Sequence, residues 1–189
     1  GRVRIFYSLR KNFGQRISAN QEIKDRFISD ISEFYSYASS GSLIIINFEG
    51  VEIFGVLPIG DVMAKLSADM KGDKKEIFKN KYLIAKDPNG GIKWVLGKYA
   101  KEHGCSIIVY YQDGDRYEIL NLPRFLKGTL DLIIQRGSLT SRELSELLGE
   151  RGKNSREYLH QLNLRGLVAR TAVDSGYDKV VWRYTAVRL

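Results

Sequence analysis

The sequence is poor in cysteine, proline and histidine. Its 189 residues contain one cysteine, three prolines and two histidines. The lone thiol, Cys105, excludes an intramolecular disulfide. His103 and Cys105 form an H-x-C pair without the second pair of ligands that a zinc site needs, and His160 lies far away in the sequence. We therefore expect neither a disulfide nor a zinc site.

Long hydrophobic runs are also absent. The longest apolar runs are short, such as residues 43–46, whereas a membrane-spanning helix needs roughly 20 apolar residues. The amino terminus shows no basic-then-apolar signal pattern, so we expect a cytoplasmic protein that contacts no membrane. Gly1 stands where an initiating methionine would be, which suggests a trimmed chain and leaves open whether a segment precedes it.

The familiar nucleotide-binding and catalytic motifs are missing too. There is no G-x-x-x-x-G-K-[ST] loop, no G-x-G-x-x-G after a strand and no nucleophile elbow. Asp113 and Asp115 form a D-x-D pair, a spacing that some polymerases and primases use to hold two divalent cations. Asp-Gly is also the preferred chemistry of a tight hairpin turn, and only Glu118 could add a third carboxylate. We therefore favour the turn, and a binding protein without metal or cofactor over an enzyme.

What the sequence does contain is positive charge. Lysine and arginine number 30 against 22 acids, which gives a net charge of +8. Residues 65–101 hold ten lysines against four acids, and residues 126–189 hold eleven basic residues against seven acids. This balance favours polyanionic partners, because each cation placed on a phosphate releases condensed counterions.

Aromatic residues are interleaved with the lysines of residues 65–101. They are Phe78, Tyr82, Trp94 and Tyr99. Alternating cations and rings can follow a nucleic-acid strand and stack on its bases. The same pattern is also typical of charged helices whose rings face the core, and we favour this second interpretation.

The first 122 residues predict a mixed α/β domain built from short elements. The predicted helices are residues 21–38, capped by Ser18 or Asn20, and 92–102; the predicted strands are 3–7, 43–48, 51–57, 82–85, 106–111 and 116–120. Residues 60–81 predict a broken helix with a lysine-rich face. Two hairpins are expected, turning near Glu49-Gly50 and at residues 112–115, so antiparallel strands should dominate. The fold class is therefore α+β.

The rest of the chain, after a boundary near Pro123, predicts three helices and a hairpin. The predicted helices cover residues 124–136, 141–148 and 155–164, and the strands cover 168–173 and 179–187. Two capping boxes are expected to open the second and third helices, at residues 140–143 and 154–157. Gly166 suits the left-handed position that closes the third helix.

This order of helix, short extended link, helix, turn, helix and hairpin resembles the winged helix-turn-helix superfamily. Residues 162–168, LNLRGLV, are similar to the junction at which the third helix of that superfamily ends before the wing. The resemblance covers residues 123–189. It implies that the third helix enters the major groove of double-stranded DNA and that the wing lies beside a neighbouring groove or the backbone.

The resemblance also indicates which side chains would contact DNA. Leu159 and Leu162 are expected to face inward. The predicted base-reading residues on the opposite face of the helix are Arg156, His160 and Asn163. The predicted phosphate contacts are Lys153, Asn154 and Ser155 at the start of this helix, with Arg170, Tyr177, Lys179 and Arg183 in the wing.

Taken together, these features predict a two-domain, non-enzymatic DNA-binding protein, with transcriptional regulation as the favoured role. The amino-terminal domain would supply dimerisation, ligand sensing or further DNA contact. One alternative is a replication or mobile-element protein whose amino-terminal domain is a nuclease-like or primase-like unit. A second alternative is an assembly subunit whose winged helix binds another protein.

Overall fold

A five-stranded sheet forms the centre of the amino-terminal part. The computed structural model describes residues 3–18, 20–54, 58–66, 79–111, 116–174, 176 and 179–189. The strand order in the sheet is β1 (Arg4–Ser8), β3 (Leu43–Asn47), β5 (Tyr82–Lys86), β6 (Ile107–Tyr111) and β7 (Arg116–Leu120). The first four strands are mutually parallel, and β7 runs antiparallel to β6. The α+β class is confirmed.

Two expectations about strand pairing are wrong. Antiparallel strands do not dominate this sheet, and no hairpin turns at Glu49-Gly50. Instead β3 pairs in parallel with β1 and β5, while β4 (Glu52–Phe54) pairs in parallel with β2 (Arg16–Ser18). The physical reason is burial: four of the five β3 side chains are buried, and a continuous apolar run of this kind is typical of a parallel strand covered on both faces.

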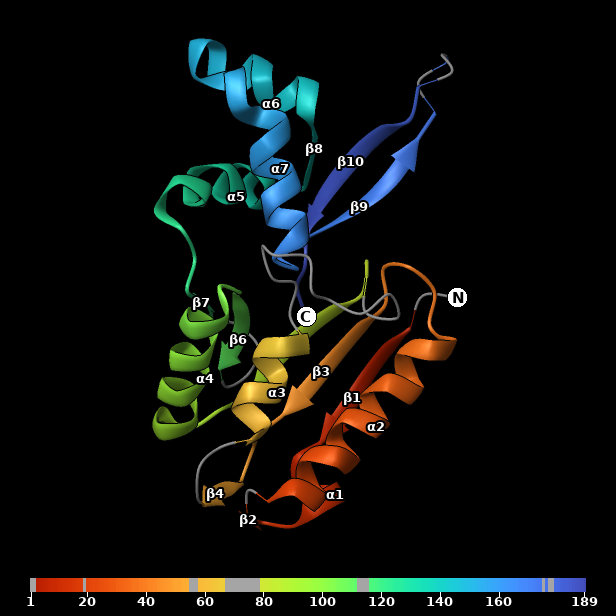
Figure 1. Ribbon diagram of the computed structural model, residues 1–189. Helices are drawn as coiled ribbons and strands as arrows, with labels where there is room; N and C mark the ends of the chain where they lie inside the picture. Colours follow the sequence, from red (N-terminus) through yellow and green to blue (C-terminus); the bar gives the residue numbers. More distant parts are fainter. Residues whose placement is uncertain are drawn as a thin grey trace.

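The helices of this part cover a single face of the sheet (Figure 1). They are α1 (Leu9–Phe13), α2 (Gln21–Tyr37), α3 (Pro58–Leu66) and α4 (Gly90–His103). The parallel strands follow one another across the sheet in one direction, and right-handed crossovers then place every connecting helix on the same side. Ile44 and Ile46 of β3 point into this helical core, whereas Leu43 and Ile45 point to the opposite face, because strand side chains alternate.

Local signals explain where the two long helices begin. The Asn20 side chain accepts a hydrogen bond from the Ile23 N–H and opens α2, and Asn89 does the same for Ile92 in α4. Gly104, with φ of 66°, closes α4 in the left-handed conformation. Both helices were predicted from their apolar periodicity and both are confirmed.

The carboxy-terminal part has the predicted order of elements. It runs α5 (Arg124–Arg136), β8 (Ser138–Thr140), α6 (Ser141–Leu148), the 3-10 turn η2 (Gly149–Asn154), α7 (Ser155–Leu164), β9 (Val168–Val173) and β10 (Val181–Ala186). The three strands form an antiparallel sheet in the order β8-β10-β9. Gly166 closes α7 with φ of 73°, and the Leu167 N–H donates to the Leu162 carbonyl, as predicted for a left-handed helix end.

One of the two predicted capping boxes is present. The Glu143 N–H donates to Thr140 Oγ1 at 3.1 Å and opens α6. The second box is wrong, because the Asn154 side chain makes no capping hydrogen bond and the Ser155 hydroxyl donates to the Gly152 carbonyl at 2.7 Å. The cause lies in Gly152, where an added Cβ would come within 2.6 Å of the Ser145 carbonyl oxygen. This close approach of two backbones sets a tight 3-10 turn where the cap was expected.

The face of the sheet that carries no helices packs against the carboxy-terminal part. Its buried side chains, which include Ile45, Ile84 and Ile108, form one hydrophobic cluster with side chains of α5, α6, α7 and the three-stranded sheet, among them Leu130 and Leu159. The proposed boundary near Pro123 therefore falls between β7 and α5, while apolar packing continues across it.

Some of the predicted features lie outside the described residues. They are residues 67–78 of the lysine-rich segment, the turn at residues 112–115 with Asp113 and Asp115, and Tyr177. Within the described residues no helix is long and apolar enough to cross a bilayer. The same part of the chain contains no group of three or more His, Cys, Asp or Glu side chains that could hold a metal ion.

Candidate nucleic-acid interface

The first half of α7 carries an exposed polar stripe. Leu159 and Leu162 are completely buried and attach the helix to the core, as predicted. Arg156 and His160, on the outward side, are exposed. Neither side chain makes a hydrogen bond or ion pair with another described residue. Both are therefore available to a partner.

Asn163 does not continue this stripe. It is half-buried, and its Nδ2 donates to the Val168 carbonyl at 2.9 Å and to the Tyr82 hydroxyl at 3.3 Å. The reason is the position of the sheet, which meets the last turn of α7 and leaves only the first turns free. Asn163 thus joins α7 to β5 and β9. No local pattern could predict this contact, because Tyr82 is 81 residues away.

The segment that leads into α7 is strongly basic. Arg151, Lys153 and Arg156 lie within six residues of each other and are exposed, and none forms an ion pair with a described residue. Asn154 is exposed beside them, whereas Ser155 is buried and its hydroxyl donates to the Gly152 carbonyl. Of the three predicted phosphate contacts at the helix start, Lys153 and Asn154 are exposed and Ser155 is buried. Arg151, which was not predicted, is a further exposed cation in this segment.

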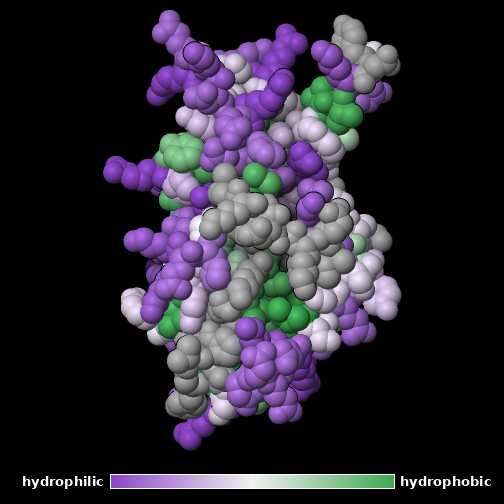
Figure 2. All heavy atoms as spheres, viewed as in Figure 1, coloured by the Kyte–Doolittle hydropathy of each residue, from purple (hydrophilic) through white to green (hydrophobic). Residues whose placement is uncertain are grey.

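Two exposed acids border this basic segment. Glu150 precedes it in η2, and Glu157 lies in the first turn of α7. The Glu157 carboxylate accepts a hydrogen bond from Gln161 Nε2 at 3.0 Å, which directs it along the helix. Figure 2 shows hydrophilic side chains gathered over α6 and the start of α7, at the end of the molecule farthest from α1.

The β9–β10 hairpin, called the wing below, presents a stacked cation. The Arg170 guanidinium lies over the Trp182 ring at 4.3 Å from its centroid, an arrangement that fixes the side chain against the sheet. The Arg170 Nε is buried and has no hydrogen-bond partner among the described residues. Lys179 is exposed just before β10. Arg170 and Lys179 are thus the two predicted wing contacts that remain on the described surface.

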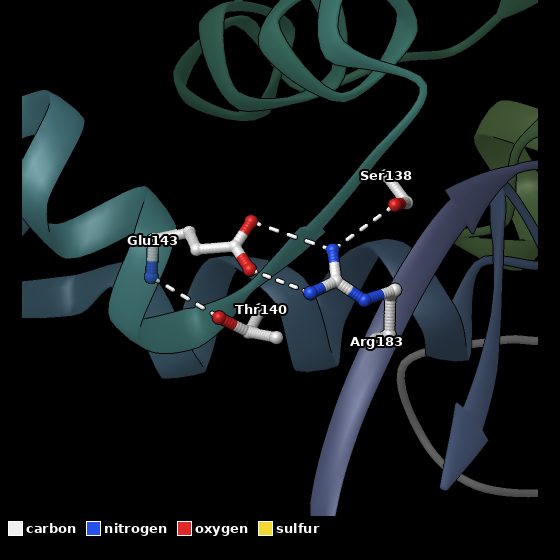
Figure 3. A network of polar contacts seen from close by, with 4 residues as sticks. All are labelled: Ser138, Thr140, Glu143 and Arg183. Atoms are coloured by element: carbon white, nitrogen blue, oxygen red, sulfur yellow. Dashed lines mark hydrogen bonds and ion pairs between the residues drawn. The ribbon is translucent and has the colours of Figure 1, made fainter. Parts of the chain in front are cut away.

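Arg183, the fourth predicted wing contact, is bound within the protein. Its Nη2 and Nη1 donate to the two carboxylate oxygens of Glu143 at 2.6 and 3.4 Å, and Nη1 also donates to Ser138 Oγ at 3.1 Å (Figure 3). This bidentate pair holds the pKa of the Glu143 carboxyl below its usual value, chiefly through the hydrogen bond from Arg183. Arg183 therefore ties β10 to the start of α6, and it does not extend outward from the wing.

A second candidate site lies at the carboxyl ends of the parallel strands. A cavity of about 830 Å³ is lined there by charged side chains that include Lys86, Asp87, Lys93, Arg116 and Glu118. Three described acids line the cavity: Glu49, Asp87 and Glu118. Lys93 Nζ lies 2.6 Å from Glu118 and Lys86 Nζ lies 2.8 Å from Asp87, whereas Glu49 forms no ion pair with a described residue. The hydrogen bond to Lys93 lowers the pKa of Glu118. The described lining residues therefore offer one unpaired carboxylate, whereas a two-metal nuclease or primase centre needs an adjacent pair.

No family model, curated protein or solved structure matches this chain. The class of protein must therefore be inferred from the order of its elements and from the side chains that they expose. Of the two candidate sites, the start of α7 has the larger set of exposed cations that form no ion pair with a described residue, namely Arg151, Lys153 and Arg156.

Proposed function

We propose that this protein binds double-stranded DNA through the start of α7 and the wing, as a winged helix-turn-helix protein. The observation that carries the proposal is the division of α7 into two parts. Its last turn is held by the sheet, while its first turns expose Arg156 and His160, which make no hydrogen bond or ion pair with a described residue. Binding by the amino-terminal end of a helix is the usual docking of this superfamily.

The dimensions of the helix suit this role. Its ten residues span about 15 Å, and the major groove, about 12 Å wide, admits one helix. Arg156, one residue after the start of α7, would reach a base edge. Arg151 and Lys153 would then meet phosphates on one side of the groove, and Arg170 and Lys179 of the wing on the other.

Transcriptional regulation is the role that we favour for such a protein. The sheet domain packs directly on α5 and α7, so a second subunit or a small molecule bound to the sheet domain would act on the DNA-binding part through a shared core. A homodimer would place two copies of α7 on two half-sites. The proposal agrees with the cytoplasmic location predicted from the sequence.

The test is a titration of a fluorescent duplex of arbitrary sequence at several salt concentrations. Each phosphate neutralised contributes about −0.9 to the slope of log K against log salt. With Arg151, Lys153, Arg170 and Lys179 on phosphates, we expect a slope of about −4. A slope smaller in magnitude than about 2, or no binding at low salt, would contradict the proposal and favour a winged unit that binds protein.

A further inference from the structure

The outer face of α4 carries an exposed tryptophan between two glycines. Trp94 is 68% exposed, the largest exposed fraction of the two tryptophans. Gly90 and Gly97 lie one turn before and one turn after it, and a Cβ added to either would meet nothing within 4 Å. A groove of about 700 Å³ is lined by Trp94, the two glycines, Leu120 and three lysines.

Gly97 has no packing reason to be glycine. It lies inside a 14-residue helix with ordinary helical backbone, where glycine is the poorest helix former after proline. A larger side chain would fit without a clash and would stabilise the helix. A larger side chain would also fill the groove beside the indole. Glycine at position 97 therefore keeps the groove open, although it lowers the stability of the helix.

The charge around the groove is positive. Lys93, Lys98 and Lys101 line it, and Lys98 Nζ lies 5.8 Å from the centroid of the Trp94 ring. Lys93 is paired with Glu118 across the groove wall, and Glu102 is the exposed acid of this helix. Lys98 and Lys101 form no ion pair with a described residue. The surface thus combines one flat apolar ring with two free cations.

We propose that this groove binds single-stranded nucleic acid. One base stacks on the Trp94 ring, and the neighbouring phosphates lie on Lys98 and Lys101. A planar apolar surface flanked by cations matches the alternation of base and phosphate along a single strand. Bases of an intact duplex are stacked on each other and leave no face for the indole, so the duplex is not the ligand of this groove.

The other two described rings of the lysine-rich segment, Tyr82 and Tyr99, do not share this role, and Phe78 lies outside the described residues. Tyr82 is buried under α7, and Tyr99 packs against the helical core, which confirms for these two residues the prediction that the rings face inward. Trp94 is the exception. This inference does not rest on the proposed duplex interface, because α4 lies beside the sheet and the start of α7 lies at the far end of the molecule (Figure 1).

The experiment uses the full chain and oligo(dT) as the probe. In a Trp182→Phe background Trp94 is the remaining indole, and we expect its emission to be quenched when oligo(dT) is added. In the matched Trp94→Phe variant, Trp182 should show no quenching. By fluorescence anisotropy, Trp94→Ala should bind labelled oligo(dT) roughly 5- to 140-fold more weakly than wild type. Quenching of Trp182 in place of Trp94 would overturn the proposal.

A second variant separates loss of the groove from loss of the fold. Gly97→Leu should melt at or above the wild-type temperature, yet bind oligo(dT) several-fold more weakly, because the leucine occupies the groove. Lys98→Gln and Lys101→Gln should each reduce the slope of log K against log salt by about 0.7, whereas Lys11→Gln, at an exposed position of α1, should leave it unchanged. Wild-type affinity in Gly97→Leu, or equal weakening by Lys11→Gln, would contradict this site. Duplex binding by Trp94→Ala should stay at the wild-type level, so failure here is distinct from failure of the duplex proposal.

Discussion

Arg156 and Arg183 look alike in the sequence but differ in their surroundings. Both were predicted to contact DNA, one in the third helix and one in the wing. Arg183 is held by Glu143, 40 residues earlier in the chain, whereas Arg156 is exposed and forms no ion pair with a described residue. Periodicity predicts on which side of a helix or strand a residue lies. It cannot predict whether a distant carboxylate meets that residue, because this depends on how the elements pack.

At the residue scale, the sharpest prediction concerns Arg156. We consider a duplex selected from random sequences for its binding to this protein. On this duplex, Arg156→Ala should cost about 1–3 kcal/mol of binding free energy and weaken the sequence preference at one base pair. The physical reason is that an arginine at the start of a helix in the groove donates two hydrogen bonds to guanine. Titrations with the selected duplex and a scrambled duplex measure both effects.

Two variants control the Arg156 experiment. Arg10→Ala removes another exposed arginine from α1, at the opposite end of the molecule, and should bind both duplexes like wild type (Figure 1). Leu159→Ala leaves a cavity in the core, so it should lower the free energy of unfolding by about 2–5 kcal/mol. If Arg156→Ala binds both duplexes like wild type, α7 is not the reading helix.

At the scale of elements, the sequence predicted most helices and strands but not their partners. The periodicity of α2, α4, α5 and α7 was sufficient, because a helix is stabilised mainly by contacts between near neighbours and by its caps. The pairing of β3 was not predictable in the same way. Its run of leucine and isoleucine fits a hairpin or a parallel core strand equally well until both of its faces are known to be covered.

The contact between Arg183 and Glu143 predicts a pH dependence of stability. The pKa of Glu143 is lowered in the folded protein, so the ion pair contributes fully above the ordinary carboxyl value of 4.5 and is lost as the pH falls through the lowered pKa. Because the two side chains are 36% and 40% exposed, the contribution should be only about 0.2–1 kcal/mol. At neutral pH, Glu143→Gln should therefore melt lower than wild type by no more than about 4 °C.

The difference between the two proteins should shrink in acid. Melting curves of wild type and Glu143→Gln between pH 7 and pH 3 test this directly, since only wild type can lose the ion pair. Glu146→Gln is a suitable control, because Glu146 contacts Arg142 on the surface of the same helix and both side chains are more exposed. A gap between wild type and Glu143→Gln that widens in acid would show that the carboxylate is not stabilised by Arg183.

At the scale of the whole molecule, the two parts of the chain depend on each other. The described helices of the first part lie on one face of the sheet, and the other face is closed by α5, α7 and the strands around them. The end of the last predicted strand and the start of the three-helix pattern predicted a boundary near Pro123 along the chain. It could not predict that Ile45, Ile84 and Ile108 would be buried by residues more than fifteen positions beyond the last of them, since no local pattern encodes such a contact.

This shared core predicts that the protein unfolds in one step. Ile31→Ala in α2 and Leu162→Ala in α7 remove buried side chains from the helical core and from the shared core, respectively. If the parts were independent, each substitution would shift only one of two melting transitions. Because the sheet would expose an apolar face without α5 and α7, we expect a single transition that both substitutions lower, by about 2–4 °C for each kcal/mol lost.

Calorimetry of wild type and the two variants measures these transitions. A parallel series with duplex added also tests the link to function. If the duplex is held by α7, it should raise the melting temperature of the single transition in which the sheet also unfolds. Two transitions, with Ile31→Ala lowering one and Leu162→Ala the other, would show that the boundary near Pro123 separates two independently stable domains.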